Sequence, residues 1–246
     1  MTPTISVVTI CKNAEASIER TLASVLRCSY PGLQYVVVDG GSTDGTGAII
    51  QRYRSGIDRY ISEPDDGISD ALNKAIELTD GDYHLIVHAD DVLLPEAPAR
   101  LIQSARHADA QVVCGTVLVI GKRGVVRKFV PEPARLLEKM SIPHMGSLVR
   151  RSAWATVGRY DKRRKIAMDH LLMLRILKCF GPDAFSVVDT TVANYHLGGI
   201  SDKCDDVGFR EVRANLLEEG AGAFRANSAY LKLLLKSRIA RLMGRS

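Results

Sequence analysis

Short apolar runs alternate with helix-like segments along the first half of the chain. Ile5 to Ile10 and Tyr35 to Val38 are rich in β-branched and other apolar residues, which is typical of buried strands. Between them, Ile18, Leu22 and Val25 recur at the spacing of an amphipathic helix. Strands separated by single helices usually lie parallel, with helices on both faces of the sheet. The pattern therefore predicts an α/β fold.

A third apolar run, Tyr83 to Val87, leads through His88 and Ala89 to two adjacent acids, Asp90 and Asp91. Open α/β sheets bind ligands just outside the carboxyl ends of their strands, so this strand would deliver charge where a ligand lies. Neighbouring carboxylates repel each other, and this favours a bound cation. A solvated turn before the next helix explains the pair equally well.

The second strand ends in a glycine-rich loop, Asp39 to Thr46. Its glycines permit left-handed backbone, and Ser42, Thr43 and Asp44 can cap the following helix. Capping does not explain Asp39, a carboxylate at the end of a buried strand, which can accept hydrogen bonds from a ribose or a base. The loop matches neither the Walker A pattern nor G-x-G-x-x-G.

A further helix should begin close to Gly67. Pro64 disfavours helix before it, Asp66 or Ser69 can serve as a cap, and the apolar residues that follow form one stripe. The N-terminus of this helix would present free amides and a positive dipole end at the same sheet edge, with Asn73 further along.

The second half contains a hairpin-like pair of β-rich runs, 112–120 and 125–130, and then a nearly continuous apolar stretch from Met168 to Phe180. The latter predicts a buried helix with Asp169 in its first turn. From the residues alone, Asp169 is either a helix cap or a functional carboxylate.

The last 22 residues combine leucines at helical spacing with a strong charge bias. They hold six basic residues and no acidic one: Arg225, Lys232, Lys236, Arg238, Arg241 and Arg245. Basic amphipathic helices bind anionic membrane surfaces. The alternative is a helix that packs its apolar residues, Leu231, Leu234, Leu235, Ile239 and Leu242, on the domain.

Composition and net charge limit the classes of molecule that the protein is expected to bind. The formal charge is +5, which permits nucleotides or phospholipids, whereas the few aromatic residues argue against nucleic-acid binding. The five cysteines are widely spaced, which favours reduced thiols over a zinc site. No secretory signal or membrane-spanning run is evident, so we expect a cytoplasmic protein, either free or peripheral on the inner membrane face.

Four motifs in register resemble those of family 2 glycosyltransferases of the GT-A fold, of the type that builds bacterial surface polysaccharides and glycolipids. They are Val8 to Asn13, Asp39 to Thr46, Ser62 to Ile68 and His88 to Asp91. Met168-Asp169-His170 and Asn194 to Ser201, with its G-G-x-S loop, are similar to later motifs of the family. The resemblance covers residues 4 to about 200.

The resemblance implies a mixed, mostly parallel GT-A-like sheet flanked by helices over residues 1–204, with nucleotide-sugar and acceptor halves meeting near residue 110. Residues 205–246 would be a helical basic extension. The implied nucleotide-sugar contacts are Thr9, Asn13, Asp39, Asp66, Asn73 and Asp90. The implied metal ligands are Asp91, with Asp90 beside it or on the ribose, and His196, which could instead contact phosphate; the ion would be Mg²⁺ or Mn²⁺. Asp169 would be the general base.

The expected reaction is an inverting, metal-dependent transfer of a sugar from a nucleotide-diphosphate sugar to a hydroxyl of a glycan or lipid-linked acceptor. Hard oxygen ligands suit such ions, and the ion neutralises the leaving diphosphate. Two alternatives remain: a nucleotidyltransferase on a similar sheet, and an inactive nucleotide-sugar-binding module. The presence of both Asp91 and Asp169 argues against the inactive module.

Overall fold

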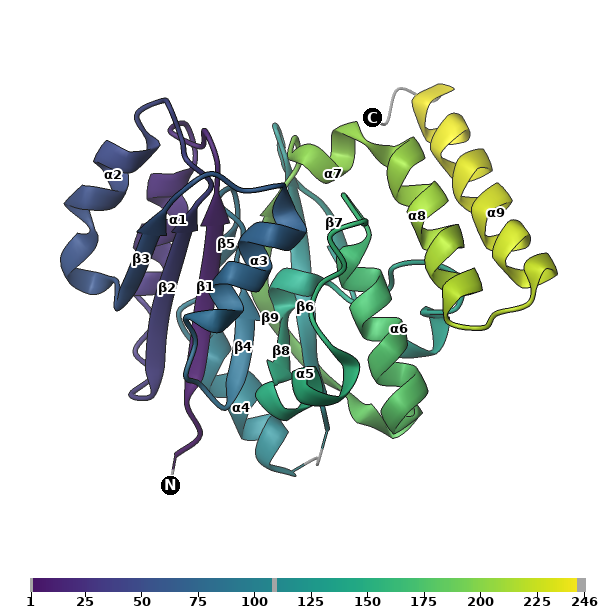
Figure 1. Ribbon diagram of the computed structural model, residues 1–246, viewed down its shortest axis with the longest axis horizontal. Coiled ribbons are helices and arrows are strands. Elements are labelled where there is room, and N and C mark those ends of the chain that lie inside the picture. Colours follow the sequence, from purple (N-terminus) through teal and green to yellow (C-terminus); the bar gives the residue numbers. More distant parts are fainter. Residues whose placement is uncertain (1, 108–109, 243–246) are drawn as a thin grey trace.

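The computed structural model describes residues 2–107 and 110–242 and is built on one mixed sheet covered by helices (Figure 1). The strands are β1 Ile5–Cys11, β2 Leu33–Asp39, β3 Arg59–Ser62, β4 Tyr83–Ile86, β5 Val92–Leu93, β6 Val112–Gly121, β7 Gly124–Phe129, β8 Ser147–Arg150 and β9 Phe185–His196. The helices are α1 Ile18–Leu26, α2 Thr46–Arg52, α3 Ile68–Glu77, α4 Ala97–His107, α5 Arg151–Val157, α6 Met168–Phe180, α7 Ile200–Lys203, α8 Asp205–Glu218 and α9 Ala223–Leu242.

The strands follow the order β3-β2-β1-β4-β8-β6-β9-β5, with β7 paired to β6. β1, β2, β3 and β4 are parallel to one another, as the alternation of apolar runs and helices predicted. β8 is antiparallel to its neighbours β4 and β6, whereas β6 and β9 are parallel. The carboxyl ends of β1, β2 and β4 therefore meet at one edge of the sheet, where the polar motifs lie.

Apolar side chains fill both faces of the sheet because successive strand residues point to opposite sides. Val8, Val36 and Val38 pack towards α3 and α6, whereas Val7 and Val37 pack towards α1 and α4. Burying apolar groups on both sides explains why these strands read as continuous apolar runs.

Glycines with a positive φ lie at two helix boundaries, and the boundary at Gly67 was predicted. α3 begins immediately after Gly67, which has a φ of +105°, and α5 ends at Gly158, which has a φ of +80°. Side chains with a Cβ rarely adopt this backbone conformation. The predicted hairpin is also confirmed, with β6 and β7 antiparallel around Gly124.

Helices α8 and α9 make up the predicted extension, and they differ in their packing. Val212, Asn215 and Leu216 of α8 are buried, and α8 packs on α6, so this helix belongs to the main core. α9 lies outside α8 and contacts it through Ala226 and Ala229 (Figure 1). None of the described helices is both long and apolar enough to cross a membrane.

Candidate active site

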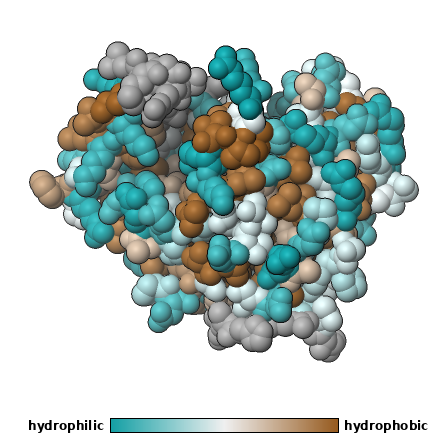
Figure 2. Space-filling view, turned by 180° about the vertical axis from the view of Figure 1, so that it is seen from behind, coloured by the Kyte–Doolittle hydropathy of each residue, from teal (hydrophilic) through white to brown (hydrophobic). Residues whose placement is uncertain are grey.

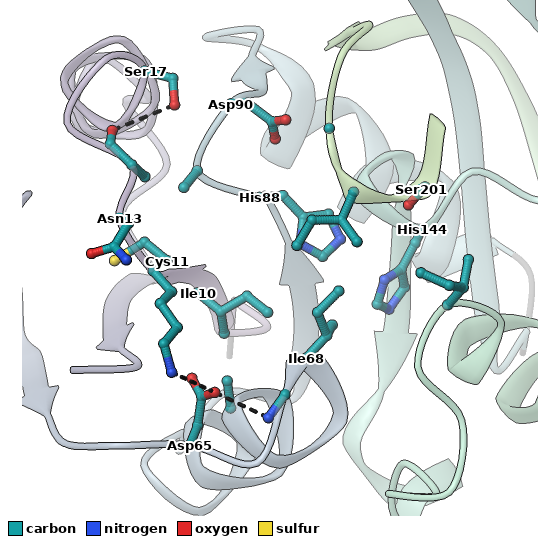
Figure 3. A pocket seen from close by; sticks show the side chains of 18 of the residues that line it. Ile10, Cys11, Asn13, Ser17, Asp65, Ile68, His88, Asp90, His144 and Ser201 are labelled. Carbon is teal, nitrogen blue, oxygen red and sulfur yellow. Dashed lines mark hydrogen bonds and ion pairs between the residues drawn. The ribbon is translucent and has the colours of Figure 1, made fainter. Parts of the chain in front are cut away.

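A cleft of about 360 Å³ opens at the carboxyl edge of the sheet (Figure 3). Its walls come from the loops after β1, β3, β4 and β9 and from the starts of α3 and α6. Of the residues predicted as site residues, the structure brings Asn13, Asp90 and Asp169 to its walls. Ligand sites of open α/β sheets lie at such an edge.

Asn13 connects the end of β1 to the glycine-rich loop after β2. Its side-chain Oδ1 accepts a hydrogen bond from the backbone N–H of Thr43 at 2.9 Å, and its own N–H donates to Ser42 Oγ at 2.8 Å. Asn13 has a φ of +50°, a conformation that asparagine tolerates better than most residues. The two loops are thereby held together at the cleft.

Asp39 is buried beside the cleft and braces the loop that follows it. The hydroxyl of Ser42 donates to Asp39 Oδ1 at 2.5 Å, and the hydroxyl of Ser62 donates to Oδ2 at 2.7 Å. Both carboxylate oxygens are therefore used inside the protein. Asp39 does not line the cleft.

Thr9 and Asn73, which were expected to contact the nucleotide sugar, do not line the cleft. The buried hydroxyl of Thr9 is 3.0 Å from Tyr35 Oη. The amide of Asn73 donates to the carbonyl of Tyr160 at 2.9 Å and accepts from its N–H at 3.0 Å. Both side chains are used to hold the fold together.

Asp65 lines the cleft, whereas the predicted Asp66 is exposed and does not. Asp65 Oδ1 accepts a hydrogen bond from Gly67 N at 3.0 Å and lies 3.7 Å from Lys12 Nζ. A Cβ at Gly40 would lie 1.9 Å from Asp65 Oδ2, so a larger residue there would displace the Asp65 side chain. The sequence does not show which side chain of an adjacent acidic pair points into the cleft.

In the second acidic pair, Asp90 and Asp91, again only one side chain faces the cleft. Asp90 faces the cleft, and a Cβ at Gly199 would lie 2.9 Å from its Oδ2, so the loop after β9 passes close to this carboxylate. Asp91 is fully buried, and its Oδ1 accepts a hydrogen bond from His196 N at 3.2 Å. Burial and the nearby charge of Asp90 raise the pKa of Asp91 well above its usual range. Of the two predicted carboxylates, Asp90 is therefore the one that faces the cleft.

The donor atoms near Asp90 fit part of a divalent-cation site. In the described part of the chain, no three His, Cys, Asp or Glu side chains gather as a complete metal site. However, Asp91 Oδ2 and His196 Nδ1 are buried without a hydrogen-bond partner there. Mg²⁺ is often held by one or two carboxylates together with substrate phosphates, so an incomplete protein ligand set suits this type of ion.

Asp169 lies at the start of α6, on the cleft wall formed by the second half of the chain. Its Oδ1 accepts a hydrogen bond from His170 N at 2.7 Å. Burial raises the pKa of Asp169 to about 6, while that hydrogen bond opposes the shift. A carboxylate with a pKa near the working pH is well matched to general-base catalysis.

Glu211 of α8 holds the segment that precedes Asp169. Its carboxylate accepts hydrogen bonds from the backbone N–H groups of Lys165, Ile166 and Ala167 at 2.8, 2.9 and 2.8 Å. No sequence pattern indicates this role, because Glu211 lies more than forty positions from the segment it contacts. The position of Asp169 thus depends on a helix in the predicted extension.

His88 and His144 also line the cleft (Figure 3). Their ring centroids are 5.8 Å apart, and His144 Nε2 is 2.6 Å from Tyr160 Oη. Burial lowers the pKa of His144 to about 3, so this imidazole is neutral at pH 7. His170, by contrast, is a core residue that bonds to the carbonyl of Leu136.

The family model described as glycosyl transferase family 2 matches residues 6–164, which is more than half of the chain. The chain belongs to this family. It is 31% identical over 210 residues to an uncharacterized glycosyltransferase of Mycobacterium tuberculosis, covering 79% of this chain and 78% of that protein. A PGL/p-HBAD biosynthesis glycosyltransferase of Mycobacterium bovis is 28% identical over 217 residues, covering 84% and 82% of the two chains.

Solved structures agree with the family fold. A mannosyltransferase of Pyrobaculum calidifontis, in complex with GDP-Man and Mn²⁺, superimposes with a TM-score of 0.69 at 16% identity. The match covers 98% of this chain and 76% of that protein. The predicted glycosyltransferase activity and GT-A-like fold are thus confirmed.

Proposed function

We propose that this glycosyltransferase moves a sugar, with inversion, from a nucleotide-diphosphate sugar to a hydroxyl of a glycan or lipid-linked acceptor. The observation that carries the proposal is that Asp90 and Asp169 stand on walls of the same cleft but come from its two halves. Direct displacement requires a base on the acceptor side, while the diphosphate leaves from the opposite face of the sugar. We assign the acceptor side to Asp169 and the diphosphate side to Asp90.

Asp169 would take the proton from the acceptor hydroxyl during attack. Its pKa of about 6 keeps it mostly ionised at neutral pH and still basic enough to bind a proton. Asn13 and Asp65 would contact the nucleotide sugar at the β1 side of the cleft. Asp39 would support them indirectly, because it fixes the loop to which Asn13 is bonded.

A divalent cation would be held mainly by Asp90, with His196 and Asp91 beside it and the donor phosphates as further ligands. Such an ion neutralises the charge that develops on the leaving diphosphate. The Mn²⁺ and GDP-Man in the Pyrobaculum calidifontis mannosyltransferase structure support this choice of ion class. Gly199 lets the loop after β9 lie directly against Asp90.

Calorimetry of UDP and GDP, with and without Mn²⁺, tests the cation site. We expect Asp90→Asn to abolish the increase in nucleotide affinity that Mn²⁺ produces, because a hard anionic ligand is lost. Asp91→Asn is the comparison variant, and it should reduce that increase less than Asp90→Asn does, because the Asp91 carboxylate is buried and does not line the cleft. The opposite result would return the metal to Asp91, and metal-independent binding in the wild type would remove the cation from the proposal.

We further infer that α9 contacts an anionic membrane surface, where a lipid-linked acceptor would be found. Phe224, Leu231 and Leu235 are 89%, 62% and 62% exposed and lie on one side of α9, opposite the alanines that pack on α8. Ile239 continues this stripe, and Arg225, Lys232 and Lys236 flank it. The predicted Arg245 lies outside the described residues, as do the side chains of Arg241 and Leu242.

Vesicle co-sedimentation checks this contact. We expect the wild type to bind vesicles that contain phosphatidylglycerol and to be released as salt is raised, since the electrostatic share is screened. The double variant Leu231→Ser/Leu235→Ser should bind about tenfold more weakly, because it loses apolar area. Val207→Ser, at an exposed apolar position of α8, is the control. Equal vesicle binding by all three proteins, or no vesicle binding by the wild type, would refute the contact.

A further inference from the structure

The β6–β7 hairpin forms an apolar and basic projection from the molecule. Val125 and Val126 are consecutive strand residues, which point to opposite faces, yet they are 61% and 60% exposed. From residue 112 to residue 130 the sequence contains no acidic residue but four basic ones: Lys122, Arg123, Arg127 and Lys128. Among the described strands, β7 pairs only with β6. Apolar surface of this kind marks an interaction site.

This projection is continuous with the mouth of the cleft. Leu197, which is 45% exposed, donates its N–H to the carbonyl of Ile120 at 2.9 Å and directly precedes the cleft residues Gly198 and Gly199. A Cβ at Gly121 would lie 2.7 Å from Val126 Cγ2 and 3.8 Å from Leu197 Cδ1. Figure 2 shows an apolar patch below the hydrophilic projection at the top centre, where the hairpin lies after the half-turn from Figure 1. We call Lys122, Arg123, Val125, Val126 and Leu197 the hairpin rim.

The charges on the hairpin argue against a second copy of this chain as the partner. Antiparallel pairing of β7 with its own copy would bring Arg127 and Lys128 of both chains close together, and like charges across strands are destabilising. An anionic partner with an apolar part complements both the basic residues and the exposed apolar residues of the rim. Lysine and arginine bind phosphate, and the valines offer apolar contact.

We propose that the hairpin rim binds the lipid-phosphate part of the acceptor and directs the acceptor's hydroxyl into the cleft. This inference rests on the proposed function and narrows its acceptor to a phosphate-bearing lipid. Contact with the bilayer alone would not require the rim to adjoin the cleft, but Leu197 joins the hairpin to the loop that lies against Asp90.

Farnesyl phosphate, used below its aggregation concentration, is a suitable probe for isothermal titration calorimetry. We expect the wild type to bind it at least tenfold more tightly than farnesol or inorganic phosphate, because each fragment lacks one half of the interaction. Lys122→Ser/Arg123→Ser and Val125→Ser/Val126→Ser should each weaken binding about tenfold or more. Leu231→Ser/Leu235→Ser, which alters only α9, should bind the probe as the wild type does.

The same proteins titrated with UDP or GDP and Mn²⁺ separate this inference from the proposed function. Hairpin variants with normal nucleotide binding and weakened probe binding support the rim. Hairpin variants that bind the probe normally overturn it, even if they sediment poorly with vesicles, since the hairpin would then contact only the bilayer. Loss of probe binding in the α9 variant also overturns it. A wild type that binds no nucleotide would instead refute the proposed function.

Discussion

Replacing Asp169 by asparagine is expected to lower turnover by about 10²-fold or more while leaving donor affinity close to that of the wild type. Asp169 stands on the acceptor side of the cleft, and asparagine cannot take a proton from the acceptor hydroxyl. Turnover can be followed as nucleoside diphosphate released from the nucleotide sugar, and donor affinity by calorimetry.

The fold should survive this substitution, because asparagine caps a helix about as well as aspartate and its side-chain oxygen can still accept the hydrogen bond from His170 N. Asp161→Asn is a suitable control, since Asp161 lies on the loop before α6 and pairs with Arg163 outside the cleft. Wild-type turnover in the Asp169 variant would show that this residue is only a cap. If neither the wild type nor the variant released nucleoside diphosphate, the inactive-module alternative would be favoured instead.

The pKa of Asp169 also predicts the acid limb of the pH profile. Turnover should fall about tenfold per pH unit below about pH 6, as the base becomes protonated. The effect on stability has the opposite sign, because folding raises this pKa and so disfavours the carboxylate. The free energy of unfolding contributed by Asp169 decreases as pH rises from its unfolded pKa through about 6. Asp169→Asn should therefore be at least as stable as the wild type at pH 7.

The parallel part of the sheet could be predicted from the sequence because β1, β4 and most of β2 are buried on both faces. Tyr35 to Val38 and Tyr83 to Val87 have no polar alternation to obscure them, and glycines such as Gly67 and Gly158 mark helix boundaries through their positive φ. Local sequence patterns are enough to predict these strands and helix boundaries. They do not predict that α8 packs into the core, because its partner α6 is distant in the chain.

The loops that the motifs identify line the cleft, but the sequence does not show which side chain of each acidic pair faces it. Asp65 and Asp66, like Asp90 and Asp91, are adjacent acids, and only one of each pair reaches the cleft. Motif spacing locates such a loop at the sheet edge but leaves open which carboxylate turns inward. Asn73 shows the converse problem, since its amide fits a ligand in principle but binds the backbone of Tyr160 instead.

Glu211→Ala is expected to destabilise the protein and to impair catalysis, although Glu211 is remote from Asp169 in sequence and beyond the residues that the family model matches. The substitution leaves three backbone N–H groups ahead of α6 without their acceptor, which should cost about 2–3 kcal/mol of unfolding free energy. Turnover should fall about tenfold, because small displacements of a catalytic group are costly. Urea denaturation and steady-state kinetics measure the two effects.

Glu218→Ala is the matched control on the same helix, because Glu218 forms ion pairs with the side chains of Arg163, Arg164 and Arg175 and should cost less than Glu211→Ala. A positioning role also predicts a change that mere destabilisation would not produce. The charge of Glu211 helps to raise the pKa of Asp169, so the acid limb of the pH profile should move to lower pH in Glu211→Ala. Glu211→Gln retains an acceptor oxygen and should recover part of the stability. An unshifted profile with wild-type turnover would limit Glu211 to holding the fold, and it would mean that Asp169 keeps its position without α8.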